Sequence, residues 1–354
     1  MITFKGWAQD LMLSLFKREA TYNAGVTMSS TNACLMRGYE VSVDWDDEVV
    51  TDKGEITGSE FGTDQELNTQ RVKITYKEPR AKPNTLAGLG ALVLGSITTT
   101  QDGALTAYRH RITPVAAGSE LRSIQAEHRA GGVQYAYRGI KGNTLKIAGE
   151  AGGYASVEAE LIGSGTRTSS ATSFVSAISE SWLRLAICRV WLETGTAISI
   201  SPTLTQEAQN ISTGTPVDLR VRLKSFEWTY NNNIDAQLGF GGTGVAQDLD
   251  YGRRSVDLKF SLLFAGATEL TYFLEQRPVA IEFDLAGATI ATGGTLRFGF
   301  QLIVPRFKIK KAPLPVGGVG DILSCDFECD VQSDGTNPVS ILEAYNARSG
   351  YILA

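Results

Sequence analysis

Residues 225–233, with the sequence SFEWTYNNN, form the stretch that decides the fold class of this chain. Aromatic residues alternate there with polar ones: Phe226, Trp228 and Tyr230 against Glu227, Thr229 and Asn231. A period of two with bulky side chains on one face is typical of a β-strand that has one face in a core and the other in water. The stretch therefore predicts a half-buried strand.

The same pattern occurs earlier, at residues 38–46 (GYEVSVDWD). A second alternating segment follows each copy, at residues 71–77 and 255–261, and a third lies at residues 154–161 and 322–331. The order is the same while the spacing between the copies shrinks along the chain, as expected for one domain written twice with different loop lengths. We therefore predict a mainly β chain of two tandem β-sandwich or barrel domains, each with a short flanking α-helix.

The predicted domains occupy residues 38–165 and 225–335. Residues 166–224 are a connector, which is unusually long for a segment without a function of its own. Residues 1–37 are predicted as an N-terminal arm with a helix, and residues 336–354 as a C-terminal tail.

Helical periodicity is present in four segments. Within residues 1–20 apolar side chains recur at helical spacing, and this helix would dock on its own domain or on a neighbouring copy: Phe4, Trp7, Leu11, Met12 and Leu15. Residues 84–94, with Asn84 as N-cap, and residues 268–276 are predicted as short helices. Residues 339–346 fit one further helical turn.

Further strands are predicted at residues 279–285, 296–304 and 306–310. Residues 182–191 (WLRLAICRVW) fit a strand or a buried helix equally well, because periodicity does not decide for a short apolar run. An arginine-rich insert at residues 98–132 has no counterpart in the second copy.

The composition is that of a globular chain, with 354 residues, 43% hydrophobic and 20% charged. A net charge of −5 argues against a protein that grips the nucleic-acid backbone, although not against one that lets nucleic acid pass. The chain has neither an apolar run of membrane-spanning length nor a signal peptide, so we expect synthesis in the cytosol. Of the four cysteines, Cys325 and Cys329 lie about 13 Å apart along one strand, too far to bridge each other.

Motifs for chemistry are weak. Gly239, Gly241 and Gly244 fit the GxGxxG dinucleotide pattern, but the residues that follow lead into another strand and not into the helix that a pyrophosphate site needs. His110 and His128 both have arginine neighbours, which disfavour a general base. We predict no catalytic, cofactor-binding or metal-binding residue.

The third strands carry carboxylates on their polar faces, which include Glu158 and Glu160 in one copy and Asp326, Glu328 and Asp330 in the other. Two interpretations stay open. These faces are either solvated outer surfaces, or the wall of an acidic channel that repels a polyanion.

Several segments together resemble the tail tube (major tail) proteins of long-tailed, non-contractile bacteriophages, in the version where one chain carries two tube domains. The segments that carry the resemblance are SFEWTYNNNI (225–234), SVDLKFSLLF (255–264), TELTYFLEQ (268–276), VGGVGD (316–321) with the acidic strand after it, and GNTLKIAGEAGGYASVEAELIGSG (142–165). The insert at residues 98–132 and the long connector depart from the pattern.

The resemblance implies a structural virion protein whose chains form trimeric, pseudo-hexameric rings stacked into a tube around a DNA channel. Its partners would be further copies, the tail-tip and head-proximal tail proteins, and DNA that passes without specific binding. The residues expected to line the channel are Glu40, Ser42, Asp44, Lys73, Glu158, Glu160, Glu227, Thr229, Asn231, Lys259, Asp326, Glu328 and Asp330. The residues expected between rings are Trp7, Leu11, Asp52, Glu55, Phe61, Phe240 and Asp248.

Two alternatives compete with a tube. A distal tail or baseplate hub protein would use the same fold in one terminal ring without polymerising. A carbohydrate-binding β-sandwich would need exposed aromatic side chains in loops, whereas Trp228, Tyr230 and Phe260 lie on predicted core faces.

Overall fold

The computed structural model describes residues 9–36, 38–45, 47–51, 65–194, 198–212, 216–238, 244–263, 268–313 and 324–352. This part of the chain is mainly β, as predicted, and its strands pair antiparallel. The first half contributes β1 (Gln9–Leu13), β2 (Cys34–Met36), β3 (Glu40–Trp45), β4 (Glu48–Thr51), β5 (Gln65–Thr69), β6 (Val72–Glu78), α1 (Pro83–Leu94), β7 (Gly95–Gln101), β8 (Tyr108–Pro114), β9 (Ile124–Ala130), β10 (Val133–Glu150), β11 (Ser156–Gly163) and β12 (Arg167–Ser169).

The described residues of the second half contribute a short 3₁₀ helix, η1, twelve strands and one α-helix. They are η1 (Leu185–Ile187), β13 (Cys188–Thr194), β14 (Ser199–Ile200), β15 (Ile211–Ser212), β16 (Val217–Asp218), β17 (Leu223–Asn231), β18 (Ile234–Gln237), β19 (Asp248–Tyr251), β20 (Ser255–Leu263), α2 (Thr268–Leu274), β21 (Val279–Thr289), β22 (Arg297–Lys311), β23 (Ser324–Val331) and β24 (Ile341–Asn346).

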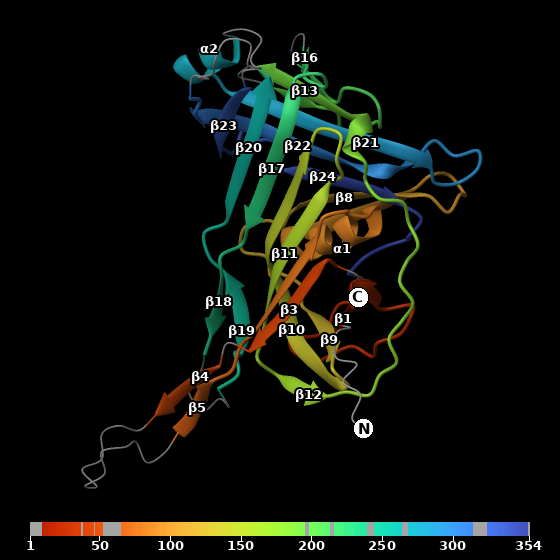
Figure 1. Cartoon of the computed structure of the whole chain (residues 1–354), viewed down its shortest axis with the longest axis vertical. Coiled ribbons are helices and arrows are strands. Elements are labelled where there is room, and N and C mark those ends of the chain that lie inside the picture. The colour runs from red at the N-terminus through yellow and green to blue at the C-terminus, as the bar shows by residue number, and fades with distance from the viewer. Residues whose placement is uncertain are drawn as a thin grey trace, which may run out of the picture.

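One run of strands organises the molecule, and we call it the central sheet. Its order is β3–β6–β11–β10–β17–β20–β23–β22, with every neighbouring pair antiparallel. In Figure 1, β17 and β20 run along the long axis of the molecule, whereas β21 crosses them near the upper end. The central sheet therefore extends through both halves of the chain without a break.

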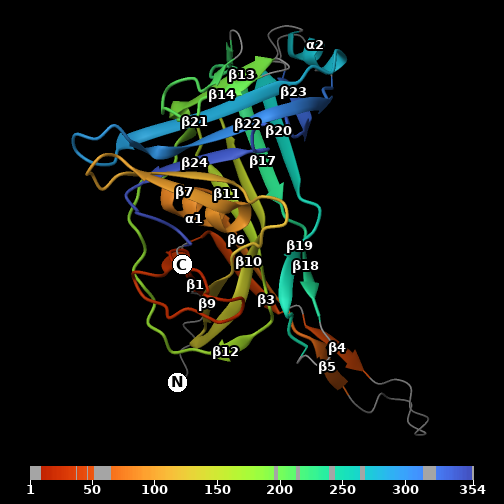
Figure 2. The same cartoon turned by 180° about the vertical axis from the view of Figure 1, so that it is seen from behind.

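The two longest strands, β10 and β22, each belong to two sets of pairings. The first part of β10 pairs with β9 and β12, and its last part with β11 and β17. The first part of β22 pairs with β21 and β24, and its last part with β23. Strands β21, β22, β24, β8 and β7 pair in this order, and we call β21, β24, β8 and β7 the second layer. The insert at residues 98–132 supplies regular strands to this layer. Figure 2 shows β7 and β24 on the same side of the molecule as α1.

The core lies between the central sheet and the second layer. Trp228 and Tyr230 are fully buried on the covered face of β17, with ring centroids 6.2 Å apart. The indole Nε1 of Trp228 donates a hydrogen bond to Ser340 Oγ at 3.2 Å, which satisfies its polar atom inside the core. The alternation in residues 225–233 therefore predicts the buried face correctly.

The α1 helix is buried at every position, between β10 on one side and β24 and β8 on the other. Its glycines are explained by contacts, since a Cβ at Gly88 would lie 2.6 Å from Leu15 Cδ1 and one at Gly90 would lie 2.9 Å from Leu342 Cδ2. The predicted helix at residues 84–94 is confirmed, but its N-cap is Lys82 and not Asn84. The α2 helix confirms the other short helix, predicted at residues 268–276.

Three local predictions are wrong. Residues 9–13, expected in a helix, form β1, and the C-terminal residues 341–346 form β24 instead of a helical turn. The two strands predicted at 296–304 and 306–310 are one continuous strand, β22. The open choice at residues 182–191 resolves into η1 followed by β13, which pairs with β21.

Candidate functional surface

The exposed face of the central sheet carries side chains of alternating charge, aligned from strand to strand. We call this alignment the charge row. Its members, one per strand in the order of the sheet, are Glu40, Lys77, Glu158, Lys146, Glu227, Lys259, Glu328 and Lys311. Six of the seven neighbouring pairs in the row are directly opposite each other, and the seventh, Lys146 with Glu227, is one diagonal step apart. The sign of the charge therefore changes at each strand.

Ion pairs link the charge row at several points. Lys77 Nζ lies 2.9 Å from Glu40 Oε2, and this carboxylate raises the pKa of Lys77. Lys146 Nζ lies 2.7 Å from Glu227 Oε2. Lys311 Nζ lies 3.2 Å from Glu328 Oε1. Opposite charges on adjacent strands favour this strand order, because like charges placed there would repel.

All thirteen residues expected to line a channel lie on this face of the central sheet. Beside the charge row stand Ser42 and Asp44 on β3, Lys73 on β6, Glu160 on β11, Thr229 and Asn231 on β17, and Asp326 and Asp330 on β23. Lys73 Nζ pairs with Glu160 Oε2 at 2.6 Å. The carboxylates of the third strands thus have lysines beside them, and the face is mixed in charge with carboxylates in excess.

Sequence reasoning missed the partners Lys146, Lys311 and Lys77. Lys146 and Lys311 come from β10 and β22, and the neighbours of these strands depend on pairing between distant parts of the chain. A partial signal was the alternation of lysines in FKIKK (307–311), which fits a strand with a wet face. It indicates Lys308 and Lys310, whereas a bulge at residue 310 places Lys311 opposite Glu328.

The junction between β10 and β17 joins the two halves of the chain, and we call it the internal seam. Thr144, Leu145 and Lys146 of β10 lie opposite Asn231, Tyr230 and Thr229 of β17. At the end of the seam the buried Asn232 side chain donates hydrogen bonds to the carbonyls of Val93 and Gly142, at 2.7 and 2.8 Å. The seam is therefore tied to the C-terminal end of α1.

The residues expected between rings fall into three groups. The expectation for Leu11 is wrong, because this side chain is fully buried in β1 and cannot contact another ring. Asp248 is on β19, where its carboxylate pairs with Lys141 Nζ at 2.7 Å. The others lie outside the described residues: Trp7, Asp52, Glu55, Phe61 and Phe240. Figure 1 shows the β4–β5 hairpin projecting from the lower end of the molecule, and its Val49 and Leu67 are exposed.

Both histidines lie in strands, His110 in β8 and His128 in β9. His110 is buried, with Nδ1 2.9 Å from Thr99 Oγ1 and Nε2 3.2 Å from Asn346 Oδ1, and burial lowers its pKa to about 4. His128 sits in β9 between β1 and β10, where burial also lowers its pKa. Of the GxGxxG glycines, Gly239 and Gly241 lie outside the described residues, and Gly244 packs against the Asn68 carbonyl.

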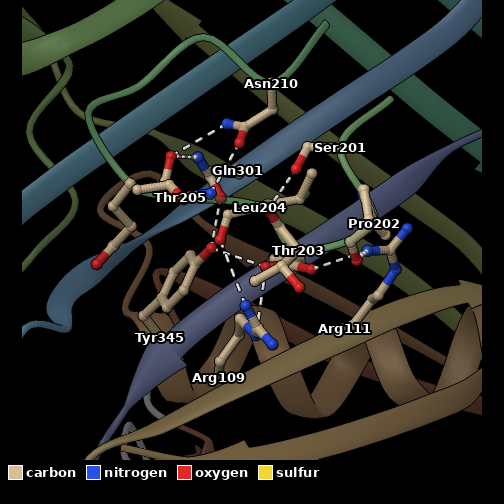
Figure 3. Close-up of polar contacts among 12 residues, drawn as sticks. Arg109, Arg111, Ser201, Pro202, Thr203, Leu204, Thr205, Asn210, Gln301 and Tyr345 are labelled. Atoms are coloured by element: carbon tan, nitrogen blue, oxygen red, sulfur yellow. Dashed lines mark hydrogen bonds and ion pairs between the residues drawn. The ribbon is translucent and has the colours of Figure 1, made fainter. Parts of the chain in front are cut away.

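The connector contacts the second layer through polar groups, some of them buried (Figure 3). Arg111 Nη1 donates to the Pro202 carbonyl at 2.8 Å, and Gln301 Nε2 donates to the Thr205 carbonyl at 3.0 Å. The buried Glu282 carboxylate accepts from the backbone and side chain of Asn210, at 2.8 and 2.6 Å. The connector is thus part of the packed structure over residues 201–212.

The phage tail tube protein family model matches residues 15–331, which is most of the chain. The chain belongs to the phage tail tube protein family. It is a structural tail protein, and the family is not an enzymatic one. Membership also implies self-assembly into a tube with other tail proteins. A search of curated proteins gives no match. Among the described residues, no helix is long and apolar enough to cross a membrane.

Proposed function

We propose that this tail tube protein forms trimeric rings that stack into the tube of a phage tail, with DNA passing through the lumen. The single observation that carries the proposal is that the central sheet ends in two outer strands, β3 and β22, to which another chain could pair. Among the described residues, β3 pairs only with β6, so its other edge has unpaired backbone groups. An edge of this kind favours pairing with another chain.

Each chain supplies two equivalent units to such a ring. The orders β3–β6–β11–β10 and β17–β20–β23–β22 are the same in strand direction and in the signs of their charges. This supports the division into tube domains at residues 38–165 and 225–335, with residues 1–37, 166–224 and 336–354 as arm, connector and tail. Three chains then give a ring with pseudo-sixfold symmetry.

The exposed face of the central sheet lines the lumen in this proposal. Among the described residues, Lys73, Lys77, Lys146 and Lys311 on this face are paired with carboxylates, which leaves these ammonium groups less available to phosphates, and the excess of carboxylates repels DNA. DNA can then slide without being held. The protein is made in the bacterial host cytoplasm and joins tail-tip and head-proximal proteins in the virion.

Negative-stain electron microscopy of the purified protein tests the assembly. We expect tubes whose end views have threefold symmetry with six similar lobes. Single rings that never stack would favour a distal tail or baseplate hub protein instead. Protein that stays monomeric at every concentration and salt condition would contradict the proposal.

A DNA-retention assay tests the lumen assignment. Asp257→Lys with Asp326→Lys adds positive charge to the exposed face of the central sheet, where both residues are exposed. We expect assembled tubes of this variant to retain DNA, and wild-type tubes not to. The matched control is Asp235→Lys with Glu275→Lys, which changes the same charge at exposed positions elsewhere. Equal retention by both variants would place the lumen on another face.

A further inference from the structure

We propose that the internal seam is a template for the contact between copies, so that the last residues of β22 pair with β3 of the next copy in the register that β10 uses with β17. This inference rests on the proposed ring and adds the residues and the register of its closure. The partner is a second copy of this chain.

The first support is the equivalence of β22 and β10. Lys311 lies opposite Glu328 of β23, as Lys146 lies opposite Glu158 of β11. One step earlier, Lys308 of β22 lies opposite Asp330, and Thr144 of β10 lies opposite Glu160. A bulge at residue 310 separates the two positions on β22. Both strands therefore present the same edge, on the side away from β23 and β11.

The second support is the equivalence of β3 and β17. Glu40 lies opposite Lys77 of β6, as Glu227 lies opposite Lys259 of β20. The strand β17 uses its other edge for the internal seam. The same edge of β3 has no partner strand among the described residues.

The β22 edge is nearly open as well. Along residues 308–311 the paired strand is β23, and β21 ends its pairing at Phe307. On the open side the Ile309 carbonyl accepts one long hydrogen bond, 3.4 Å, from Gln276 Nε2. A backbone N–H from an incoming strand can replace this side-chain donor with a shorter bond.

Transfer of the seam register to the two edges gives a specific set of opposed residues. The predicted pairs are Lys308 with Asp44, Ile309 with Val43, and Lys311 with Ser42 of the next copy. In the seam Lys146 reaches diagonally to Glu227, so Lys311 is expected to reach Glu40 of the next copy. The contact then has two oppositely charged pairs, Lys308 with Asp44 and Lys311 with Glu40, and one apolar pair. The apolar pair falls on the core face of the sheet, because both Ile309 and Val43 pack in the core.

The charge row gives an independent check on direction. It begins with a carboxylate at β3 and ends with an ammonium group at β22. Closure of β22 onto β3 continues the alternation around the ring, whereas contact between two β3 edges or two β22 edges would set like charges together. The charges therefore select head-to-tail pairing, which closes a ring.

The helices agree with this placement. In the first half α1 packs on β10 and also contacts β17 across the internal seam. In the second half α2 packs on β22, and Leu274 at its end is 76% exposed. An incoming copy would cover this apolar side chain, as β17 and the second layer cover α1.

Disulfide trapping tests the register. Lys308→Cys with Asp44→Cys places two thiols directly opposite across the proposed contact, at a Cα separation of about 4.5–5.5 Å that a disulfide can span. We expect covalent dimers and closed trimers on non-reducing gels, with free thiols blocked before denaturation because Cys34, Cys188, Cys325 and Cys329 are native thiols. The matched internal control is Thr144→Cys with Asn231→Cys, which should form a bond within one chain at any protein concentration.

An off-register variant makes the test decisive. In Lys308→Cys with Ser42→Cys the second thiol is displaced by two residues, about 7 Å along the strand, so we expect at least tenfold less cross-linking. Tubes in the microscope with off-register cross-links only, or with none in either variant, would overturn the register and leave the tube intact. Absence of any assembly would instead count against the proposed function.

Discussion

The internal seam and the two outer edges of the central sheet are built from equivalent strands, yet only the seam is covered. At the seam, β17 completes β10, Asn232 ties the contact to α1, and α1 is buried throughout. At the outer edges, β3 and the end of β22 have the same charges, but α2 exposes Leu274. In the assembly that we propose, one contact belongs to the fold of the chain and its equivalent forms between copies.

The largest expected effect is a difference in unfolding free energy between a substitution in α1 and one in α2. Leu92→Ala in α1 removes a fully buried side chain and should lower the free energy of unfolding by about 2–5 kcal/mol. Leu274→Ala in α2 should change it by less than about 0.5 kcal/mol in the unassembled protein, because this side chain is exposed. Urea unfolding of the monomer measures both. Equal losses would mean that α2 is as well covered as α1.

The next effect concerns the tie between the seam and α1. Asn232→Ala removes the donor of two buried hydrogen bonds and leaves the carbonyls of Val93 and Gly142 unsatisfied, which should cost about 2–3 kcal/mol of unfolding free energy. Asn231→Ala is the control, because this half-buried neighbour accepts a hydrogen bond from the Asn233 backbone and no other side-chain bond of Asn231 is seen among the described residues; it should cost about 1 kcal/mol or less. A small loss at both positions would show that the seam does not depend on this tie.

The strand pattern explains how much the sequence could predict. Residues 225–233 alternate because β17 has one face in the core and one in water, and the same holds for β3, β6, β11, β20 and β23. Alternation assigns each side chain to a face, so the thirteen channel candidates could be placed on one face without knowledge of any pairing. It does not say which strands are neighbours, so the lysines of β10 and β22 that complete the charge row were missed.

The errors occur where both faces of a strand are buried. Leu11, Met12 and Leu13 in β1 are all buried, and so is every residue of β24. Without a wet face such segments lose the period of two, and a short apolar run then also fits a helix. The second layer and the connector cover these strands, and neither could be located from local sequence.

Away from the seam, the contact between the connector and β21 should make the stability of the chain depend on pH. Burial raises the pKa of Asp284 to about 7, with Glu282 adding to the rise, and a backbone N–H of Glu207 and the Arg189 guanidinium opposing it. The folded state therefore binds this proton more tightly than the unfolded state, so stability is highest at low pH and falls as the pH rises toward 7. Between pH 5 and 8 the loss should be about 2.5 kcal/mol from this group.

Asp284→Asn tests this effect, because the amide stays neutral and can still accept from the Glu207 N–H. The variant should show a flatter dependence of unfolding free energy on pH than the wild type. Glu180, whose pKa burial also raises to about 7, stays in both proteins and contributes equally to both curves. Parallel curves would mean that Asp284 is ionised in the folded protein across this range.

The smallest effect on stability gives the sharpest test of the comparison itself. Lys146 and Lys311 hold equivalent positions in the charge row, one at the internal seam and one at an outer edge. Lys146→Glu breaks the ion pair with Glu227 inside the chain and should lower monomer stability by about 1 kcal/mol. Lys311→Glu loses only the exposed pair with Glu328 in the monomer, so its stability should change by less than about 1 kcal/mol.

Across the proposed contact, however, the new carboxylate would face Glu40 of the next copy, and the concentration at which tubes appear should rise roughly tenfold, which corresponds to about 1.4 kcal/mol. Light scattering against protein concentration measures this onset, and because repulsion between exposed charges is screened, added salt should reduce the defect of Lys311→Glu. If Lys311→Glu assembled at the wild-type concentration, the outer edge of β22 would not be a second copy of the seam, whatever the similarity of their strands.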